Sequence, residues 1–262
     1  MSRALAARIA TAAVLIAAAV AALFLLPKTG LAVLVALLAA AGAHEWARLC
    51  GLANPVAWLY AAAAAIAYGA LLASGEPAMR LAFVAAALFW MLVVPIWLAR
   101  GVDRAQRLAL GVAGFVVLIP AAVALARLQP ARVLQVLVLV WVADTAAYFI
   151  GRAWGRRKLA PAISPSKTWE GAWGGIAGAV AYAIIGGTFL TGVRAWPVYA
   201  VVALLLGAIS IVGDLFESAA KRQAGVKDSG SLLPGHGGIL DRVDSATAVL
   251  PVAALLLSLL NP

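Results

Sequence analysis

The largest group of polar side chains in this chain runs from Gly213 to Ser245. The protein is 65% hydrophobic and 11% charged, and this one segment holds five of its ten acidic residues. It also contains four basic residues and one of the two histidines: Lys221, Arg222, Lys227, Arg242 and His236. In a chain this apolar, such a concentration of charge indicates catalysis or transport more often than a contribution to stability.

The spacing within this segment suits a bound cation and a phosphorylated ligand. On a continuous helix, five polar side chains recur three or four residues apart and share one face: Asp214, Glu217, Ser218, Lys221 and Arg222. Glycines between Pro234 and Gly238 predict a tight loop that a ligand can approach closely. Asp241 and Asp244 then open the next helix, where a favourable interaction with the helix dipole is the structural alternative. Carboxylates from separate helices suit Mg²⁺, and neighbouring basic residues suit a polyphosphate.

A second polar group is the basic loop from Gly151 to Gly171. Its run of arginines and Lys158 is typical of contact with lipid headgroups. The stretch Ser164–Thr168 is more specific, because Pro165 restricts the backbone, hydroxyls flank it and Lys167 supplies a positive charge. Ser166 or Thr168 can cap the helix that follows. A helix N-terminus with hydroxyls and a lysine is suited to a phosphate, and a plain helix cap is the alternative.

The third polar feature is a single carboxylate, Asp144, inside an apolar segment. A carboxylate is costly in such a position. On a helix, Asp144, Tyr148 and Arg152 follow one stripe because they are four residues apart. Asp144 could therefore be a metal ligand, a proton carrier or one half of a structural ion pair.

These polar groups are positioned by apolar runs of about twenty residues, the pattern of membrane-spanning helices. We predict an all-α polytopic membrane protein, because an open sheet cannot satisfy its backbone in lipid. The nine expected spans lie near 5–26, 30–49, 54–74, 79–99, 108–126, 131–150, 171–190, 196–213 and 243–260. They divide into an N-terminal transmembrane region, 1–127, and a C-terminal catalytic region, 128–262. The first run could be a cleaved signal peptide, but its length and the spans that follow at once favour a retained helix.

The distribution of basic residues predicts the orientation of these spans. With a cytoplasmic N-terminus, 15 of the 20 lysines and arginines fall on the cytoplasmic side, together with both large polar loops. Tryptophans lie near span ends, as in an aromatic belt: Trp46, Trp58, Trp97, Trp154 and Trp196. The net charge of +10 therefore indicates topology and phosphate-bearing ligands rather than nucleic acid. The single cysteine, Cys50, excludes an internal disulfide.

At these polar residues the chain resembles the phosphatidate cytidylyltransferase (CDP-diacylglycerol synthase) family. The downstream signature is matched by Ser218, Lys221, Arg222, Lys227, Asp228, Gly230, Pro234, His236, Gly237, Gly238, Asp241, Arg242 and Asp244. The upstream Ser-Pro-x-Lys-Thr-x-Glu-Gly motif is matched by Ser164, Pro165, Lys167, Thr168, Glu170 and Gly171. Asp144 resembles the acidic residue of the preceding membrane helix. One departure is Ala220, where a larger aliphatic side chain is usual, and it should alter packing more than chemistry.

The resemblance implies a transferase of phospholipid biosynthesis that takes CTP and phosphatidate to CDP-diacylglycerol and pyrophosphate with Mg²⁺. The attacking phosphate oxygen is already anionic, so the main requirement is electrostatic stabilisation of two anionic substrates and of the departing pyrophosphate. The expected metal ligands are Asp214 and Asp241, supported by Asp244 and Asp144, with a second cation, K⁺ or Mg²⁺, as a further expectation. The expected catalytic residues are Asp214, Asp241, Asp244, Lys221, Arg222 and His236. The expected substrate-binding residues are Ser164, Ser166, Lys167, Thr168, Lys227, Asp228 and Arg242.

Two alternatives follow from the same residues. A CTP-dependent lipid kinase would also need metal and basic residues, but only nucleotidyl transfer releases pyrophosphate. An ion-coupled transporter would explain Asp144, but it would be expected to carry interrupted helices in matching halves, which this sequence lacks. We expect an integral protein of the bacterial plasma (inner) membrane, and its small-residue helix faces permit a homodimer without requiring one.

Overall fold

The computed structural model describes residues 3–103, 106–191, 196–232 and 237–260, and it is almost entirely helical. In the first half the helices are α1 (Arg3–Leu25), α2 (Lys28–Leu49), α3 (Asn54–Ala73), α4 (Glu76–Leu88), the π-helical turn η1 (Phe89–Val93), α5 (Val94–Arg100) and α6 (Arg107–Arg127). In the second half they are α7 (Pro130–Trp154), α8 (Trp169–Thr191), α9 (Trp196–Gln223) and α10 (Leu240–Leu260). The all-α prediction is therefore confirmed.

Each of the nine predicted spans overlaps one helix or, for 79–99, the continuous rod formed by α4, η1 and α5. Pro95 explains the π-helical turn, since it has no N–H to donate to the preceding turn. Seven helices in the described part of the chain are long and apolar enough to cross a membrane. The number of membrane crossings stays a prediction.

Two elements differ from the expected outline. Helix α9 continues to Gln223, well beyond the predicted end at 213, and so keeps the acidic and basic residues of that segment on one helix. The expected loop 151–171 contains a short antiparallel hairpin of β1 (Lys158–Ala160) and β2 (Ser164–Thr168). Alternating polar residues around a proline carry little strand signal, so the hairpin could not be read from the sequence.

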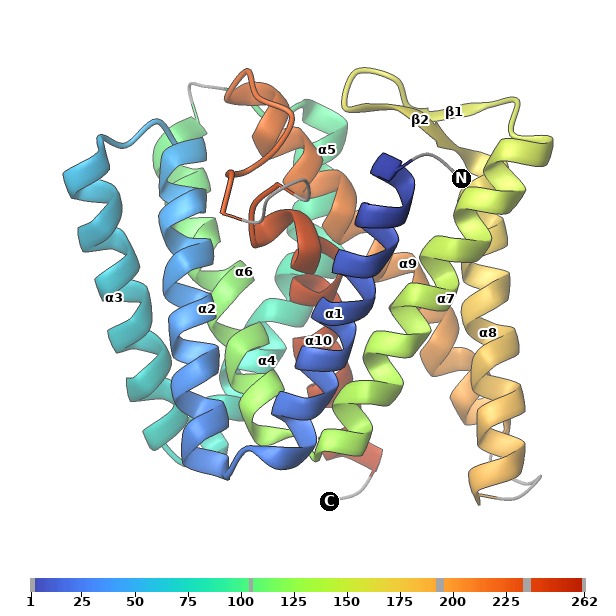
Figure 1. Cartoon of the computed structure of the whole chain (residues 1–262), viewed down its shortest axis with the longest axis horizontal. Helices are drawn as coiled ribbons and strands as arrows, with labels where there is room; N and C mark the ends of the chain where they lie inside the picture. Colours follow the sequence, from blue (N-terminus) through green and yellow to red (C-terminus); the bar gives the residue numbers. More distant parts are fainter. Residues whose placement is uncertain (1–2, 104–105, 192–195, 233–236, 261–262) are drawn as a thin grey trace.

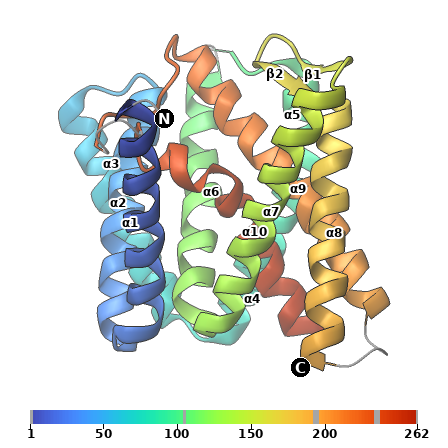
Figure 2. The same ribbon diagram turned by 45° about the vertical axis from the view of Figure 1, so that its right-hand side comes forward.

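Both polar segments lie at the same end of the bundle. Figure 1 shows the β1–β2 hairpin and the connection from α9 to α10 at the top, with the start of α1, whereas α10 ends at the bottom. The view in Figure 2 keeps the hairpin and the α9–α10 connection at this end. The fold thus brings together two segments that are far apart in the sequence.

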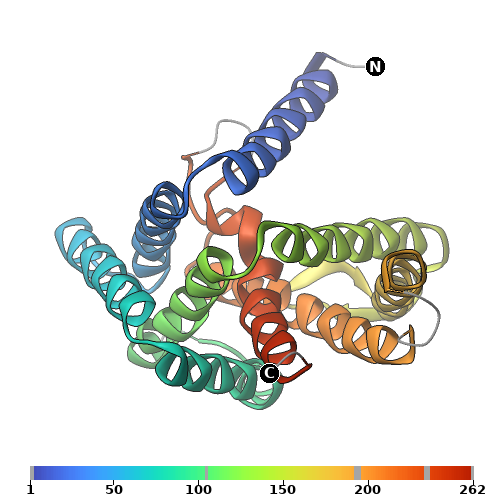
Figure 3. The ribbon, with the colours of Figure 1, turned by 90° about the horizontal axis from the view of Figure 1, so that it is seen from below.

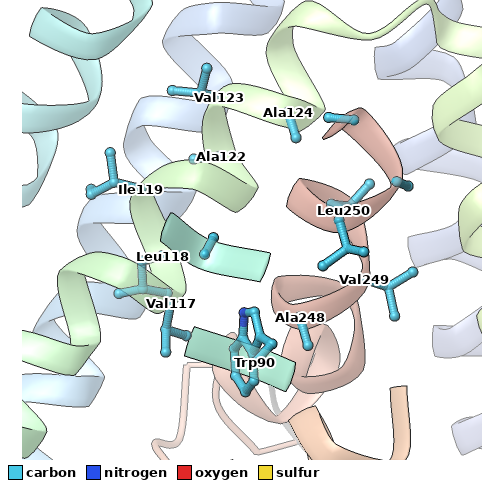
Figure 4. Close-up of a cluster of buried hydrophobic side chains, with 14 of the residues drawn as sticks. Trp90, Val117, Leu118, Ile119, Ala122, Val123, Ala124, Ala248, Val249 and Leu250 are labelled. Carbon is cyan, nitrogen blue, oxygen red and sulfur yellow. The ribbon is translucent and has the colours of Figure 1, made fainter. Parts of the chain in front are cut away.

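Helix α10 lies at the centre of the bundle. Seen from below, it separates α2, α3 and α4 on one side from α7, α8 and α9 on the other (Figure 3), and it contacts α2, α4, α6, α7 and α9. It packs against α6 and α4, and Trp90, Val117 and Val249 are buried in the same hydrophobic cluster (Figure 4). This packing fixes the position of the start of α10, whose first turn carries Asp241 and whose second turn begins with Asp244.

Small residues allow the C-terminal helices to approach closely. A Cβ atom on Gly171 or Gly175 would lie 2.9 Å from the carbonyl oxygen of Ala147 or Ala143 on α7. A Cβ atom on Gly213 of α9 would lie 2.7 Å from the Cβ atom of Ala248 on α10. The glycines of α8 therefore lie directly against the backbone of α7, and these close contacts hold α7, α8, α9 and α10 in register.

Candidate active site

Three aspartates from three helices approach one another around a lysine, and we call this set the open cluster: Asp144, Asp214, Asp244 and Lys167. The Asp214 carboxylate interacts electrostatically with both of the other carboxylates. Lys167, from β2, forms an ion pair with Asp214 although 47 residues separate them in the sequence. About a quarter of each paired side chain remains exposed, 26% for Lys167 and 27% for Asp214.

The other partners within the open cluster are few. Ser218 donates a hydrogen bond to Oδ1 of Asp214 at 3.3 Å, and the backbone N–H of Ser245 donates to Oδ1 of Asp244 at 2.7 Å. Asp144 is exposed and Asp244 is half-buried. These carboxylates therefore retain oxygen lone pairs that a cation or a water molecule can use.

A second set of charged groups lies beside the first and is enclosed, and we call it the closed cluster: Glu217, Lys221, Asp241 and Ser229. The Lys221 ammonium lies 3.0 Å from Oε1 of Glu217 and 2.7 Å from Oδ1 of Asp241. The side chains of Glu217 and Asp241 are only 5% and 6% exposed. A buried lysine between two buried carboxylates satisfies the rule that buried charges are paired.

The second oxygen of Asp241 is also occupied. Its Oδ2 accepts hydrogen bonds from the backbone N–H of Ser229 at 2.9 Å, from the Ser229 hydroxyl at 3.0 Å and from the backbone N–H of Gly238 at 2.8 Å. Gly237 adopts φ +80°, and a Cβ atom there would lie 2.6 Å from this same oxygen. The sequence predicted that the glycines of this loop allow close approach of a ligand. In the structure Gly237 instead makes room for the carboxylate of Asp241.

Glu45, on α2, joins the N-terminal half of the chain to this loop. Only 4% of this residue is exposed. Its Oε1 accepts a hydrogen bond from the N–H of Ile239 at 2.9 Å, and its Oε2 accepts from the N–H of Leu240 at 3.0 Å and from the Ser229 hydroxyl at 2.9 Å. Glu45 therefore caps the N-terminus of α10 from another helix.

The β1–β2 hairpin is tied to the start of α8. Thr168 is buried, and its Oγ1 accepts a hydrogen bond from the N–H of Gly171 at 3.2 Å, so the predicted helix cap is confirmed. The Glu170 carboxylate accepts hydrogen bonds from the backbone N–H groups of Arg156 and Arg157. These bonds hold the segment before β1, and β1 pairs with β2, the strand that carries Lys167.

Arg222 connects the end of α9 to the hairpin, because its Nε donates to the carbonyl oxygen of Ile163 at 3.2 Å. Among the other predicted substrate-binding residues, Ser164 is half-buried. Four more of them are exposed: Ser166, Lys227, Asp228 and Arg242. Tyr148 and Arg152 are hydrogen-bonded at 2.9 Å, as their spacing predicted. Pro234 and His236 lie outside the described residues.

The donor set of the open cluster fits one kind of metal. In the part of the chain that the structure describes, no three His, Cys, Asp or Glu side chains are grouped closely enough to hold a metal ion by themselves. Mg²⁺ needs only one or two protein carboxylates, since it keeps several waters and binds substrate phosphates. Asp214 with Asp144 or Asp244 is therefore the pair that fits Mg²⁺ best, whereas both oxygens of Asp241 already accept hydrogen bonds.

Sequence reasoning missed Glu45 and Ser229 as members of this region. The sequence does carry a signal for Glu45, because it is an acidic residue inside a predicted span, as Asp144 is. Ser229 carried no such signal, since serines are common in polar loops. The contacts between α2 and the loop before α10 become visible only in three dimensions.

Comparison with known proteins agrees with these features. Residues 6–260 match the model of the cytidylyltransferase family. The chain is 41% identical over 266 residues to phosphatidate cytidylyltransferase of Pseudomonas aeruginosa, covering 95% of this chain and 96% of that protein. It is 56% identical over 118 residues to the enzyme of the same name from Brucella suis, covering 45% of this chain and 42% of that protein. The chain therefore belongs to the cytidylyltransferase family, as the signature residues of its C-terminal half predicted.

Proposed function

We propose that this protein transfers the cytidylyl group of CTP to phosphatidate, giving CDP-diacylglycerol and pyrophosphate in phospholipid biosynthesis. The observation that carries the proposal is the pairing of Lys167 with Asp214 in the open cluster. This contact joins the upstream motif, through Lys167, to the polar segment from Gly213 to Ser245 that contains the downstream signature. The similarity to phosphatidate cytidylyltransferases extends over nearly the whole chain and supports the same reaction.

In this reaction a phosphate oxygen of phosphatidate forms a bond to the α-phosphorus of CTP. The bond from that phosphorus to the oxygen bridging the α- and β-phosphates breaks, and the electron pair leaves with pyrophosphate. The attacking oxygen is already an anion, so this chain need not supply a strong base. Its task is to bring two anions together and to stabilise the charge that develops on the leaving group.

The basic residues of the site differ in their availability for this task. Lys167 is partly exposed and Arg222 is exposed, so both can reach a phosphate. Lys221 is enclosed between two carboxylates, which neutralise its charge. We therefore assign phosphate binding to Lys167 and Arg222, with Lys227 and Arg242 as exposed additional candidates, and assign Lys221 to holding the closed cluster together.

We propose Mg²⁺ as the cofactor, held by Asp214 together with Asp144 or Asp244. When bound, Mg²⁺ supplies positive charge that neutralises the phosphates and the developing pyrophosphate. Asp241, predicted as a principal ligand, is better suited to holding the loop between α9 and α10, because its carboxylate already accepts hydrogen bonds from Ser229, Gly238 and Lys221. A second cation, K⁺ or Mg²⁺, and a homodimer stay predictions.

We further propose that the end of the bundle carrying both clusters faces the cytoplasm of the bacterial inner membrane. The positive-inside rule supports this orientation, because that end carries Arg156, Arg157 and Arg222. CTP is a water-soluble nucleotide and would reach the site from the same side. The phosphate of the lipid substrate lies at the membrane surface, where the open cluster meets it.

The test is pyrophosphate release by the purified protein in detergent with phosphatidate, CTP and Mg²⁺. We expect release to require all three components, to yield a lipid product that contains cytidine, and to collapse in Asp214→Asn while persisting in Glu76→Gln. Glu76 is a suitable control, since its side chain is 81% exposed and pairs with Arg127. A phosphorylated lipid with CDP as the second product would instead establish a lipid kinase. No turnover by folded protein with any nucleotide or cation would contradict both enzyme functions.

A further inference from the structure

Glu45 is a buried carboxylate in the N-terminal half of the chain, where the sequence predicts only apolar spans. It lies on α2, and the segment it binds precedes α10, nearly two hundred residues later in the sequence. In Figure 1 this segment passes beside the upper part of α2. The three hydrogen bonds it accepts come from two backbone N–H groups and one hydroxyl. Leaving water is costly for a carboxylate unless its oxygens are hydrogen-bonded, and these three bonds offset that cost.

We propose that Glu45 is a positioning residue for the cytidylyl transfer reaction. Through Ile239 and Leu240 it sets the first turn of α10, the turn that carries Asp241 and begins one turn before Asp244. The single proton of the Ser229 hydroxyl is shared between Oε2 of Glu45 and Oδ2 of Asp241, so Glu45 also sets the carboxylate of Asp241. Its kinetic consequence rests on the proposed function, whereas the anchoring of the loop does not.

The loop is shaped to receive this side chain. A Cβ atom on Gly230 would lie 2.6 Å from Oε1 of Glu45, and a Cβ atom on Gly238 would collide with Oε2 of Glu45 and with the Ser229 hydroxyl. Any larger residue at these two positions would push the Glu45 carboxylate away from the N–H groups that donate hydrogen bonds to it. One glycine thus lies against each carboxylate oxygen of Glu45, and the loop leaves space for both oxygens.

The chemistry requires a carboxylate and not merely a polar group. All three partners donate, so they need acceptor oxygens on both sides of the side chain. Glutamine has the same shape but only one acceptor oxygen, and its NH₂ group would face a backbone N–H. The negative charge also interacts favourably with the N-terminus of α10. Glu45→Gln should therefore release the loop without removing any bulk from the core.

The first experiment compares Glu45→Gln with Glu76→Gln, the same substitution at an exposed glutamate. We expect kcat for pyrophosphate release to fall about 10- to 100-fold in Glu45→Gln, as for the loss of groups that orient a site. We expect KM for CTP to change by less than about twofold, because an interaction that acts in the transition state lowers kcat and kcat/KM together. Both variants should elute from a sizing column as the wild type does, and Glu76→Gln should match its kinetics.

The second measurement does not depend on activity. Hydrogen–deuterium exchange, followed by mass spectrometry, reports whether residues 226–245 lose protection in Glu45→Gln while α3 and α8 keep theirs. If the wild type is inactive but this loop loosens in the variant, the anchoring stands and the proposed function fails. If the wild type is active and Glu45→Gln keeps its kcat, the positioning role is wrong and the function stands.

Ser229→Ala provides a milder test in case Glu45→Gln does not fold. It removes only the hydroxyl that links Glu45 to Asp241, and we expect kcat to fall about three- to tenfold, equivalent to one hydrogen bond. In the double variant the two losses should not multiply, because the first substitution already breaks the shared bridge. Fully multiplicative losses, or a loss of activity that only follows the fraction of unfolded protein, would overturn the proposal.

Discussion

The open and closed clusters both draw carboxylates from α9 and α10, yet these carboxylates have different surroundings. Asp214 and Asp241 both lie in the polar segment from Gly213 to Ser245, and the sequence predicted the same metal-binding role for both. In the structure Asp214 keeps partly exposed oxygens beside Lys167, whereas Asp241 accepts hydrogen bonds on both oxygens. Carboxylates of one polar segment can therefore have two different roles: some can bind a ligand, and others hold the backbone in place.

The difference has a simple physical origin. The closed cluster lies where α9, α10 and the loop between them are packed together, so each charge must find a partner within the protein. The open cluster lies where three helices and the hairpin meet at the end of the bundle, and part of each side chain reaches the surface. Burial therefore decides which carboxylates are structural and which can bind a cation.

Replacing Asp214, the proposed cation ligand of the open cluster, should produce the largest effect. In Asp214→Asn we expect kcat/KM for pyrophosphate release to fall about 10³-fold, roughly 4 kcal/mol of transition-state stabilisation, because the site loses an anionic partner for the cation. Half-maximal activity should also require at least about tenfold more Mg²⁺. Initial rates measured over a Mg²⁺ titration, beside Glu76→Gln, check both effects. An unchanged Mg²⁺ requirement would exclude Asp214 as the ligand.

Breaking the closed cluster should act on stability. Lys221→Met leaves Glu217 and Asp241 buried without their cation, and we expect the free energy of unfolding to fall by about 3 kcal/mol. Thermal unfolding in detergent measures this loss, with Lys28→Met as the control because Lys28 is exposed. The double variant Lys221→Met/Glu217→Leu also removes one of the buried carboxylates, so it should recover part of the lost free energy of unfolding. Wild-type stability in Lys221→Met would contradict the structural role of this lysine.

Asp241→Asn tests the two clusters against each other. We expect kcat to fall about 10²-fold, roughly 2.7 kcal/mol, because the loop before α10 loses the acceptor that aligns it. The Mg²⁺ concentration for half-maximal activity should stay within about twofold of the wild type, unlike that of Asp214→Asn. A parallel rise in the Mg²⁺ requirement of both variants would show that Asp241 is a metal ligand and that the division into two clusters is wrong.

The smallest effect is expected for Ser218→Ala. Its hydroxyl donates one long hydrogen bond, 3.3 Å, to Asp214, whose other oxygen is held by Lys167. Losing it should reduce kcat/KM less than about fivefold, equivalent to at most about 1 kcal/mol. Steady-state kinetics beside Asp214→Asn measure the ratio. A loss as large as that of Asp214→Asn would mean that Ser218 itself binds a ligand.

Much of this outline was readable from the chain. Hydrophobic runs located the helices, since a span must be long and apolar to satisfy its backbone in lipid. The spacing of Asp214, Ser218 and Lys221 on one helix was confirmed because α9 continues through them. The β1–β2 hairpin was not predicted, because a short strand around Pro165 has no periodic pattern.

The sequence by itself determined the class of protein, the location of its helices and the residue types available for chemistry. It did so because lipid permits few backbone conformations and because polar residues are costly among apolar spans. Only the tertiary structure decided which carboxylates lie close together and which are paired with Lys221 or with the loop before α10. It also decided that Glu45 of α2 accepts hydrogen bonds from the start of α10. The reason is that burial and hydrogen bonding depend on contacts between helices, and residue spacing along one helix does not specify them.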